Sequence, residues 1–123
     1  MTVKKTVLAI DDNIQQLNEF KTMLGDKYEL RIVKAASEAI VFLNKTKSDI
    51  ILLDIEMPNI SGFEFLKDIR NVPSYITVPI IIVSGNTGKD FFDKAKNSGA
   101  QAVLTKPVNA NVLISTIEKY LQT

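Results

Sequence analysis

The chain has 123 residues, the size of one ordinary domain, and 46% of them are apolar, which predicts a folded core. Its net charge of +1 gives no reason to expect a nucleic acid or an anionic membrane as the main partner. Cysteine and histidine are both absent, which excludes disulfides, thiolate or imidazole metal ligands and histidine-based catalysis. Carboxylates, hydroxyls, lysines and the backbone remain available for chemistry.

No apolar run is long enough to cross a membrane, and the segment after Met1 is too short for a signal peptide. We therefore expect no membrane insertion and a cytoplasmic location. No linker, repeat or low-complexity stretch divides the chain, so we expect a single domain over residues 1–123.

The first part of the chain alternates between short apolar runs and helical spacing. Val7–Ile10 predicts a strand, and helical spacing begins at Asn13. The inward face of this helix is predicted to hold Ile14, Leu17, Phe20 and Leu24, with Gly25 as a left-handed cap. Residues 28–32 alternate in polarity, which is typical of an edge strand. Ser37 is expected to cap a second helix, which carries Ala39, Ile40 and Leu43.

The second part continues the alternation. Residues 50–54 form a fully apolar run into Asp54, which predicts a strand buried on both faces and a turn at Met57-Pro58. The later expected strands are residues 80–83 and 102–105. The later expected helices are one opening at Ser61-Gly62 with Leu66 and Ile69 inward, one over Asp90–Ser98 closed by Gly99, and one capped by Asn109 with Leu113, Ile117, Tyr120 and Leu121 inward.

Five repeats of strand then helix predict parallel strands joined by right-handed crossovers. Continuous apolar strands indicate helices on both faces of the sheet. The sequence therefore predicts an open, doubly wound α/β fold. The order of the strands does not follow from this pattern.

Polar residues stand where four of the predicted strands end. They are Asp11 and Asp12 after the first strand, Asp54 at the end of the third, Ser84 after the fourth and Lys106 after the fifth. Each alone is weak evidence, because each also has an ordinary structural explanation as a helix cap, a turn residue or a loop residue. Together they point to a site, because ligands bind outside the carboxyl ends of strands in open α/β sheets.

Three carboxylates crowded together repel one another, and a hard divalent cation relieves the repulsion. Mg²⁺ suits an incomplete oxygen cage that also receives phosphate oxygens. With such a cation, Asp54 becomes a candidate nucleophile for a phosphoryl group. The Lys106 ammonium and the Ser84 hydroxyl are the expected partners of the other phosphoryl oxygens, and Gly85 keeps the approach open.

These motifs, in this order and spacing over essentially the whole chain, resemble the receiver (CheY-like) domain of two-component response regulators. The segments that carry the resemblance are Asp11-Asp12, residues 54–62, Ser84 and Lys106-Pro107. The resemblance implies a flavodoxin-like (βα)5 fold with strand order 2-1-3-4-5. This order agrees with an edge position for residues 28–32.

The resemblance also implies a signalling role rather than a conventional enzyme. Asp54 would be phosphorylated from a phosphohistidine on a histidine kinase or a histidine phosphotransfer protein, and the domain would catalyse its own phosphoryl transfer and dephosphorylation. Mg²⁺ (or Mn²⁺) would be held by Asp12, Asp54 and the backbone carbonyl of Glu56, with Asp11 acting largely through water. The Lys106-Pro107 bond would be cis.

One departure concerns the switch. The family usually carries an aromatic residue where this chain has Val103, and that ring moves together with the hydroxyl residue, here Ser84. We therefore expect phosphorylation to work while the usual readout is altered. Glu56 and Asn86 occupy positions that tune phosphoryl lifetime, and Glu56 would either repel or position the attacking water.

The expected switch is the loop from Ser84 to Lys89 and the helix that follows, and the surface offered to a downstream protein target spans residues 84–106 and the last helix. In that switch helix, either one of Phe91 and Phe92 is exposed for contact or both pack on the sheet. Two other functions stay open: a haloacid-dehalogenase-like phosphohydrolase, and a degenerate receiver that only binds. Whether the chain acts alone or within a longer protein stays open as well.

Overall fold

The computed structural model describes residues 4–56 and 61–121, in which strands and helices alternate as predicted. The strands are β1 (Thr6–Ile10), β2 (Glu29–Val33), β3 (Ile50–Asp54), β4 (Ile80–Ser84) and β5 (Ala102–Thr105). The helices are α1 (Ile14–Leu24), α2 (Ala36–Lys45), α3 (Gly62–Arg70), α4 (Lys89–Lys96) and α5 (Ala110–Leu121), with a short 3₁₀ turn, η1, at Pro73–Tyr75. The predicted turn at Met57-Pro58 lies outside the described residues.

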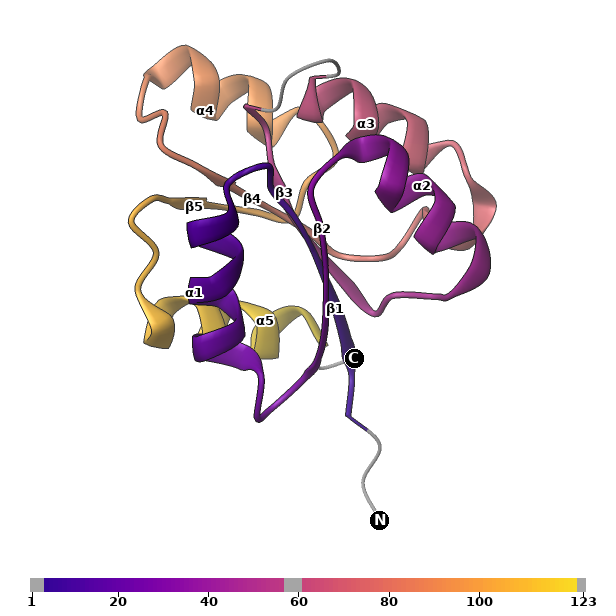
Figure 1. The fold of residues 1–123 in the computed structure, drawn as a ribbon. Helices are drawn as coiled ribbons and strands as arrows, with labels where there is room; N and C mark the ends of the chain where they lie inside the picture. The colour runs from indigo at the N-terminus through magenta and orange to yellow at the C-terminus, as the bar shows by residue number, and fades with distance from the viewer. Residues whose placement is uncertain (1–3, 57–60, 122–123) are drawn as a thin grey trace.

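All strand pairs are parallel, and the strands follow the order β2-β1-β3-β4-β5 (Figure 1). Every residue of β3 and of β4 is buried, as their continuous apolar runs predict. β2 lies at one edge, and its residues are exposed or only half-buried. The expected order 2-1-3-4-5 and the edge position of the second strand are therefore confirmed.

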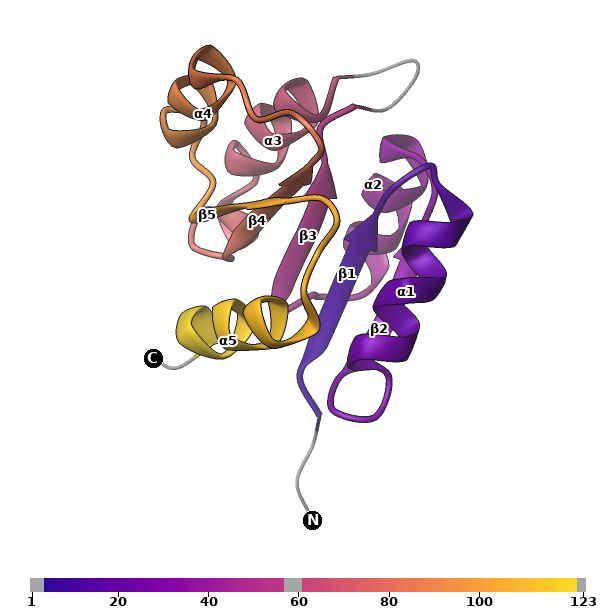
Figure 2. The same ribbon diagram turned by 90° about the vertical axis from the view of Figure 1, so that its left-hand side faces the viewer.

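Helices cover both faces of the sheet, with α1 and α5 on one side and α2, α3 and α4 on the other (Figures 1 and 2). Alternate residues along a strand face opposite layers, so β1 sends Val7 into one core and Leu8 into the other. The first core packs under Leu17 of α1 and Leu113 of α5. The second packs under Phe65 and Leu66 of α3. Because all the strands are parallel, their carboxyl ends lie at one rim of this two-sided core.

Two predictions for α1 are wrong. Ile14 is 53% exposed, because it is the first helical residue at the rim of the sheet, and Gln16 lies on the buried face instead. Gly25 has a right-handed backbone (φ −58°, ψ −29°), because the chain continues the turn: the Gly25 N–H donates to the Lys21 carbonyl and the Tyr28 N–H to the Leu24 carbonyl. The positive φ of +96° occurs at Gly99, after α4.

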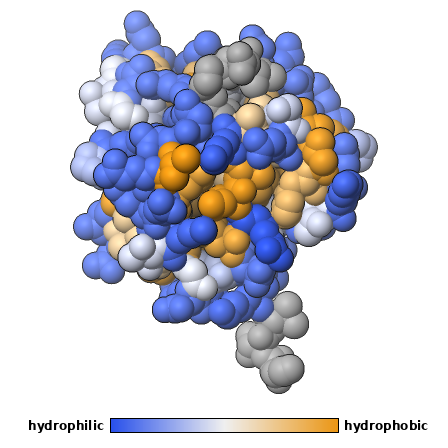
Figure 3. All heavy atoms as spheres, viewed as in Figure 1, coloured by the Kyte–Doolittle hydropathy of each residue, from blue (hydrophilic) through white to orange (hydrophobic). Residues whose placement is uncertain are grey.

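The start of α2 also differs from the prediction. The helix begins at Ala36 with Ala35 as its cap residue, and no side chain caps it, so Ser37 is already a helical residue. Ala36 is buried in the core, and this packing, rather than a capping hydroxyl, determines where the helix begins. Ile40, expected inward, is 39% exposed. Figure 3 shows apolar atoms in the middle of the face formed by α1, β2 and α2, and these helices carry the exposed residues Ile14, Ile40 and Val41.

Helix α4 runs over Lys89–Lys96 rather than the predicted Asp90–Ser98, with Asn97 as its C-cap residue, and Gly99 lies beyond its end. The starts of α3 and α5 agree with the prediction. The Ser61 side chain accepts a hydrogen bond from the Phe63 N–H at the start of α3, and the Asn109 side chain accepts from the Val112 N–H at the start of α5. Leu66 and Ile69 are buried, as are Leu113 and Ile117, while Tyr120 and Leu121 are partly buried against the same core. Both caps therefore start helices that point back across the sheet.

Candidate functional site

The four strand ends meet at the carboxyl rim of the sheet. Carboxylate oxygens of Asp11, Asp12 and Asp54 all lie within 4.8 Å of one another. The Lys106 Nζ is 2.9 Å from Asp11 Oδ2 and 3.7 Å from Asp54 Oδ1. Asp11 is 1% exposed and Asp54 5% exposed, whereas Asp12 is open to solvent. Three acids and an ammonium thus share one small, largely buried volume.

Backbone N–H groups orient the two buried carboxylates. The Asn13 N–H donates to Asp11 Oδ1 at 2.9 Å, just before α1 begins. The Glu56 N–H donates to Asp54 Oδ1 at 3.2 Å. The loop after each strand therefore folds back on the acid at that strand's end. The second oxygen of Asp11, Oδ2, accepts a hydrogen bond from the Lys106 ammonium at 2.9 Å.

Gly62 allows α3 to start close to Asp54. A Cβ atom at Gly62 would lie 2.6 Å from the Cα of Ile55 and 2.8 Å from the carbonyl oxygen of Asp54, distances that ordinary contacts do not reach. The Gly62 N–H donates to the Ile55 carbonyl at 3.1 Å. The glycine of the 54–62 segment is thus required by close packing, which holds the end of β3 in place.

The crowding changes the pKa of the central acid. Burial and the neighbouring charge of Asp11 raise the pKa of Asp54 from 3.8 to about 6, although the Glu56 N–H and the Lys106 charge act in the opposite direction. Burial also works to lower the pKa of Lys106. The hydrogen bond to Asp11 and the charges of Asp54 and Asp11 outweigh burial, so the pKa of Lys106 is raised. One ammonium therefore compensates the carboxylates only in part.

The donor set fits a hard divalent cation. Three carboxylates from the ends of two neighbouring strands offer oxygen ligands, and after burial the charge of Asp11 is the next cause of the raised pKa of Asp54. Mg²⁺ and Mn²⁺ prefer such oxygen ligands, and a doubly charged ion offsets the repulsion that one ammonium leaves. The acidic cluster is therefore compatible with a metal site.

Ser84 lies beside this cluster at the end of β4. Its hydroxyl is 1% exposed, donates to Glu56 Oε1 at 3.2 Å and accepts from the Asn86 N–H at 3.1 Å. The contact between Glu56 and Ser84 was missing from the sequence prediction. β3 and β4 are neighbours in the predicted strand order, which brings Glu56 and Ser84 to the same rim, but nothing in the pattern indicates which way the glutamate side chain turns.

β5 joins the site through Lys106. The Lys106 N–H donates to the Ser84 carbonyl at 2.8 Å, and the Lys106-Pro107 bond is cis, as the resemblance implied. Val103 is half-buried on β5 and lines a hollow of about 250 Å³ next to α4. No aromatic ring stands at that position to fill the hollow.

The sequence left open whether one of the two adjacent phenylalanines of α4 is exposed or both pack on the sheet. In the structure both are half-buried. The ring of Phe91 lies 5.9 Å from that of Phe63 and packs against the core. Phe92 lies 5.8 Å from Phe91 and borders the hollow beside Val103. α4 is thus anchored by an aromatic contact to α3 on one side and leaves space on the other.

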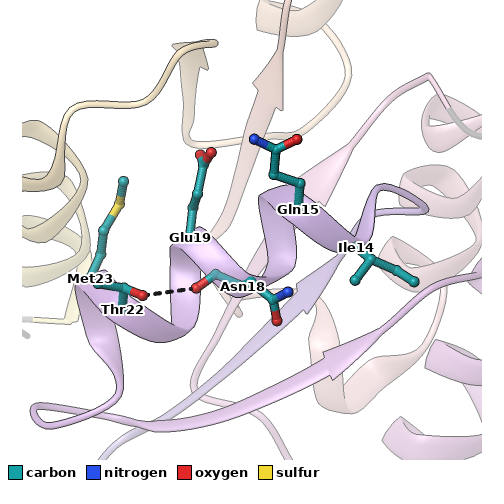
Figure 4. A pocket seen from close by; sticks show the side chains of 6 residues that line it. All are labelled: Ile14, Gln15, Asn18, Glu19, Thr22 and Met23. Atoms are coloured by element: carbon teal, nitrogen blue, oxygen red, sulfur yellow. Dashed lines mark hydrogen bonds between the residues drawn. The ribbon is translucent and has the colours of Figure 1, made fainter.

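A larger hollow of about 510 Å³ lies on the outer face of α1, lined by Ile14, Gln15, Asn18, Glu19, Thr22 and Met23 (Figure 4). It contains one carboxylate and no cluster of ionisable side chains. We therefore assign no chemistry to it, and the strand-end cluster remains the candidate site.

Comparison with known proteins identifies the type of domain. Residues 7–118 match the family model of the response regulator receiver domain. The chain belongs to this family. It is 27% identical over 118 residues to the polar-differentiation response regulator DivK of Brucella ovis, a match that spans 95% of this chain and 96% of DivK.

Solved receiver structures share the fold over nearly the whole chain. The chemotaxis protein CheY4 of Vibrio cholerae superposes with a TM-score of 0.90 at 31% identity, covering 96% of this chain and 99% of CheY4. A two-component response regulator from Clostridium difficile also gives 0.90, at 28% identity and 97% coverage of each chain. The receiver assignment and the flavodoxin-like fold are therefore confirmed.

Membership of the receiver family decides between the functional alternatives only in part. The chain is a signalling receiver domain of the two-component type, which replaces the haloacid-dehalogenase alternative.

Among the helices of residues 4–56 and 61–121, none has the length and apolarity that a membrane crossing requires.

Proposed function

We propose that this receiver domain accepts a phosphoryl group on Asp54 from a phosphohistidine of a histidine kinase or histidine phosphotransfer protein. The observation that carries the proposal is the position of Asp54: its carboxyl lies among two further carboxylates and an ammonium, at the carboxyl rim of a receiver fold. The same proposal treats the chain as one receiver domain and places it in the cytoplasm, where such a donor is charged from ATP.

In the transfer, an oxygen of the Asp54 carboxylate forms a bond to phosphorus while the bond from phosphorus to the donor imidazole nitrogen breaks. The imidazole leaves with the electron pair of that bond and takes up a proton. No side chain of this domain needs to act as a base, because the attacking carboxylate is already ionised. The domain supplies positioning and charge neutralisation.

Each remaining site residue has one proposed task. Asp11, Asp12, Asp54 and the backbone carbonyl of Glu56 hold Mg²⁺ or Mn²⁺, which when bound neutralises carboxylate charge and polarises the phosphoryl group. Lys106, now 2.9 Å from Asp11, pairs with a phosphoryl oxygen, and the Ser84 hydroxyl donates to another. Gly85 leaves the entry free, since a Cβ atom there would meet nothing within 4 Å.

Phosphorylation would add negative charge and acceptor oxygens that draw Ser84 and Lys106 inward. Ser84 is the last residue of β4 before the loop to α4, and Lys106 directly follows β5, so their movement changes the surface of residues 84–106 and α5 that a downstream protein target reads. With Mg²⁺ and beryllofluoride as a phosphoryl mimic, we expect the amide NMR signals of residues 84–106 to shift. If those signals stay unmoved, the switch part of the proposal is wrong.

The test of phosphorylation itself is intact-mass spectrometry after incubation with acetyl phosphate and Mg²⁺. We expect the wild type to gain one phosphoryl group and Asp54→Asn to gain none. Asp90→Asn, which changes an exposed carboxylate on α4, is the matched control and should label like the wild type. Adding EDTA should abolish labelling. An unlabelled wild type would instead support a degenerate receiver that acts only by binding.

A further inference from the structure

The hydroxyl of Ser84 is already engaged in the unphosphorylated domain. It donates to Glu56 Oε1 at 3.2 Å, and its oxygen accepts the Asn86 N–H at 3.1 Å. A serine hydroxyl has a single hydrogen, and an ionised carboxylate only accepts. The hydrogen that a phosphoryl oxygen on Asp54 requires is therefore the one that Glu56 holds.

Glu56 and a phosphoryl group on Asp54 compete for this hydrogen. They also carry charge of the same sign, and residues 54 and 56 are joined by the hydrogen bond from the Glu56 N–H to Asp54 Oδ1 at 3.2 Å. We propose that the Glu56 side chain is a positioning residue that holds Ser84 in the unphosphorylated arrangement and releases it when Asp54 is phosphorylated. This inference rests on the proposed function and adds the regulation of the same site.

The restraint extends to the start of α4. The Asn86 N–H is bonded to the Ser84 hydroxyl, and the Asn86 Oδ1 accepts the Gly88 N–H at 2.9 Å. Gly88 is the cap residue of α4. A continuous set of hydrogen bonds therefore runs from Glu56 at the end of β3 to the first turn of α4. When Ser84 leaves Glu56, these hydrogen bonds change, and the start of α4 changes with them. This route does not need the aromatic ring that position 103 lacks.

The test is a double-mutant cycle on beryllofluoride affinity with saturating Mg²⁺, using Glu56→Ala, Ser84→Ala and the double variant. In the Ser84 background, Glu56→Ala should tighten binding about fivefold, the net size of one typical hydrogen bond. In the Ser84→Ala background the same substitution should give no such gain. Glu64→Ala removes an exposed carboxylate from the first turn of α3 and should leave affinity unchanged.

A second measurement reads the hydrogen bonds themselves. In the absence of Mg²⁺ and beryllofluoride, Glu56→Ala should move the amide NMR signals of Asn86 and Gly88 toward their beryllofluoride-bound positions, whereas Glu64→Ala should not. A change confined to residue 56 and its sequence neighbours would contradict the connection to α4.

The outcomes separate this inference from the proposed function. If the wild type binds beryllofluoride and the effect of Glu56→Ala is the same in both backgrounds, Glu56 acts through charge alone and the restraint on Ser84 is wrong. A loss of affinity in Glu56→Ala also overturns it. If the wild type does not bind beryllofluoride at all, the proposed function fails, and the inference fails with it.

Discussion

Charged side chains have different surroundings at the two rims of the sheet. At the carboxyl rim, Asp11, Asp12 and Asp54 crowd together with one ammonium, and the pKa of Asp54 is raised to about 6. At the amino rim, the guanidinium of Arg70 is surrounded by neutral oxygen acceptors that lie before β4 and β5. They are the carbonyls of Tyr75, Ile76, Val78 and Gly99 and the side-chain oxygen of Gln101.

The contrast separates a stabilising arrangement from a functional one. Arg70 connects the end of α3 to the loops before β4 and β5 through these hydrogen bonds. The side-chain oxygen of Gln101 also accepts the Ile80 N–H at 2.7 Å, which links it to the first residue of β4. Each guanidinium nitrogen of Arg70 has a hydrogen-bond partner inside the protein. The carboxyl rim instead keeps like charges together, which lowers stability as long as no cation offsets them. Three substitutions test this contrast.

The largest effect is expected from Arg70→Met, which keeps the aliphatic stem and removes the guanidinium. Loss of its hydrogen bonds should lower the free energy of unfolding by about 3–4 kcal/mol, because carbonyls that face the stem lose their donors. Urea denaturation measures this. Arg31→Met removes an arginine whose ion pair with Glu29 is exposed, and should change stability by less than about 0.5 kcal/mol. If the two substitutions lower the free energy of unfolding equally, the hydrogen bonds of Arg70 at the amino rim do not stabilise the fold as proposed.

Asp54→Asn should stabilise the protein at pH 7.5 in EDTA. Because the pKa of Asp54 is raised from 3.8 to about 6, the folded state keeps the proton to higher pH than the unfolded chain, and the wild type loses stability as pH rises through this window. The loss corresponds to about 2–3 kcal/mol above the window. Asparagine cannot ionise, so the variant avoids this loss.

The gain from Asp54→Asn should vanish below about pH 3, where aspartate is protonated in both states. Urea denaturation at both pH values measures it, with the exposed Asp26→Asn as control. A variant that is as stable as the wild type at pH 7.5 would show that the carboxyl rim is not strained by charge.

The smallest expected effect is that of Gly62→Ala, at about 1–2 kcal/mol of destabilisation, because the added methyl group meets the backbone of Ile55 and Asp54. It should also weaken beryllofluoride binding, since the end of β3 must shift. Gly85→Ala is the matched control for stability, because a methyl group there enters open space. If both glycines tolerate alanine equally, close packing at Gly62 does not position Asp54.

Most of the architecture could be predicted because it follows from short-range patterns. β3 and β4 are unbroken apolar runs, and the helices between them repeat at helical spacing. The wrong details depend on tertiary context. Whether Ile14 is covered depends on what lies above the rim, and the start of α2 depends on the burial of Ala36.

The grouping of the candidate site residues could also be predicted from the sequence, but their side-chain contacts could not. Parallel strands bring their carboxyl ends to one rim, so the grouping of Asp11, Asp54 and Lys106 follows from the strand pattern alone. The contact between Glu56 and Ser84 and the hydrogen bonds of Arg70 depend on side-chain rotamers and helix lengths. Residue types and spacing contain little information about either.

The most direct test of the central claim is to locate the phosphoryl group chemically. After incubation with acetyl phosphate and Mg²⁺, borohydride reduces an aspartyl phosphate to homoserine, and peptide sequencing by mass spectrometry identifies the converted residue. We predict homoserine at position 54 and at no other aspartate or glutamate. Conversion at another acid, or none in a wild-type protein that has gained a phosphoryl mass, would contradict the assignment of Asp54 as the phosphoryl acceptor.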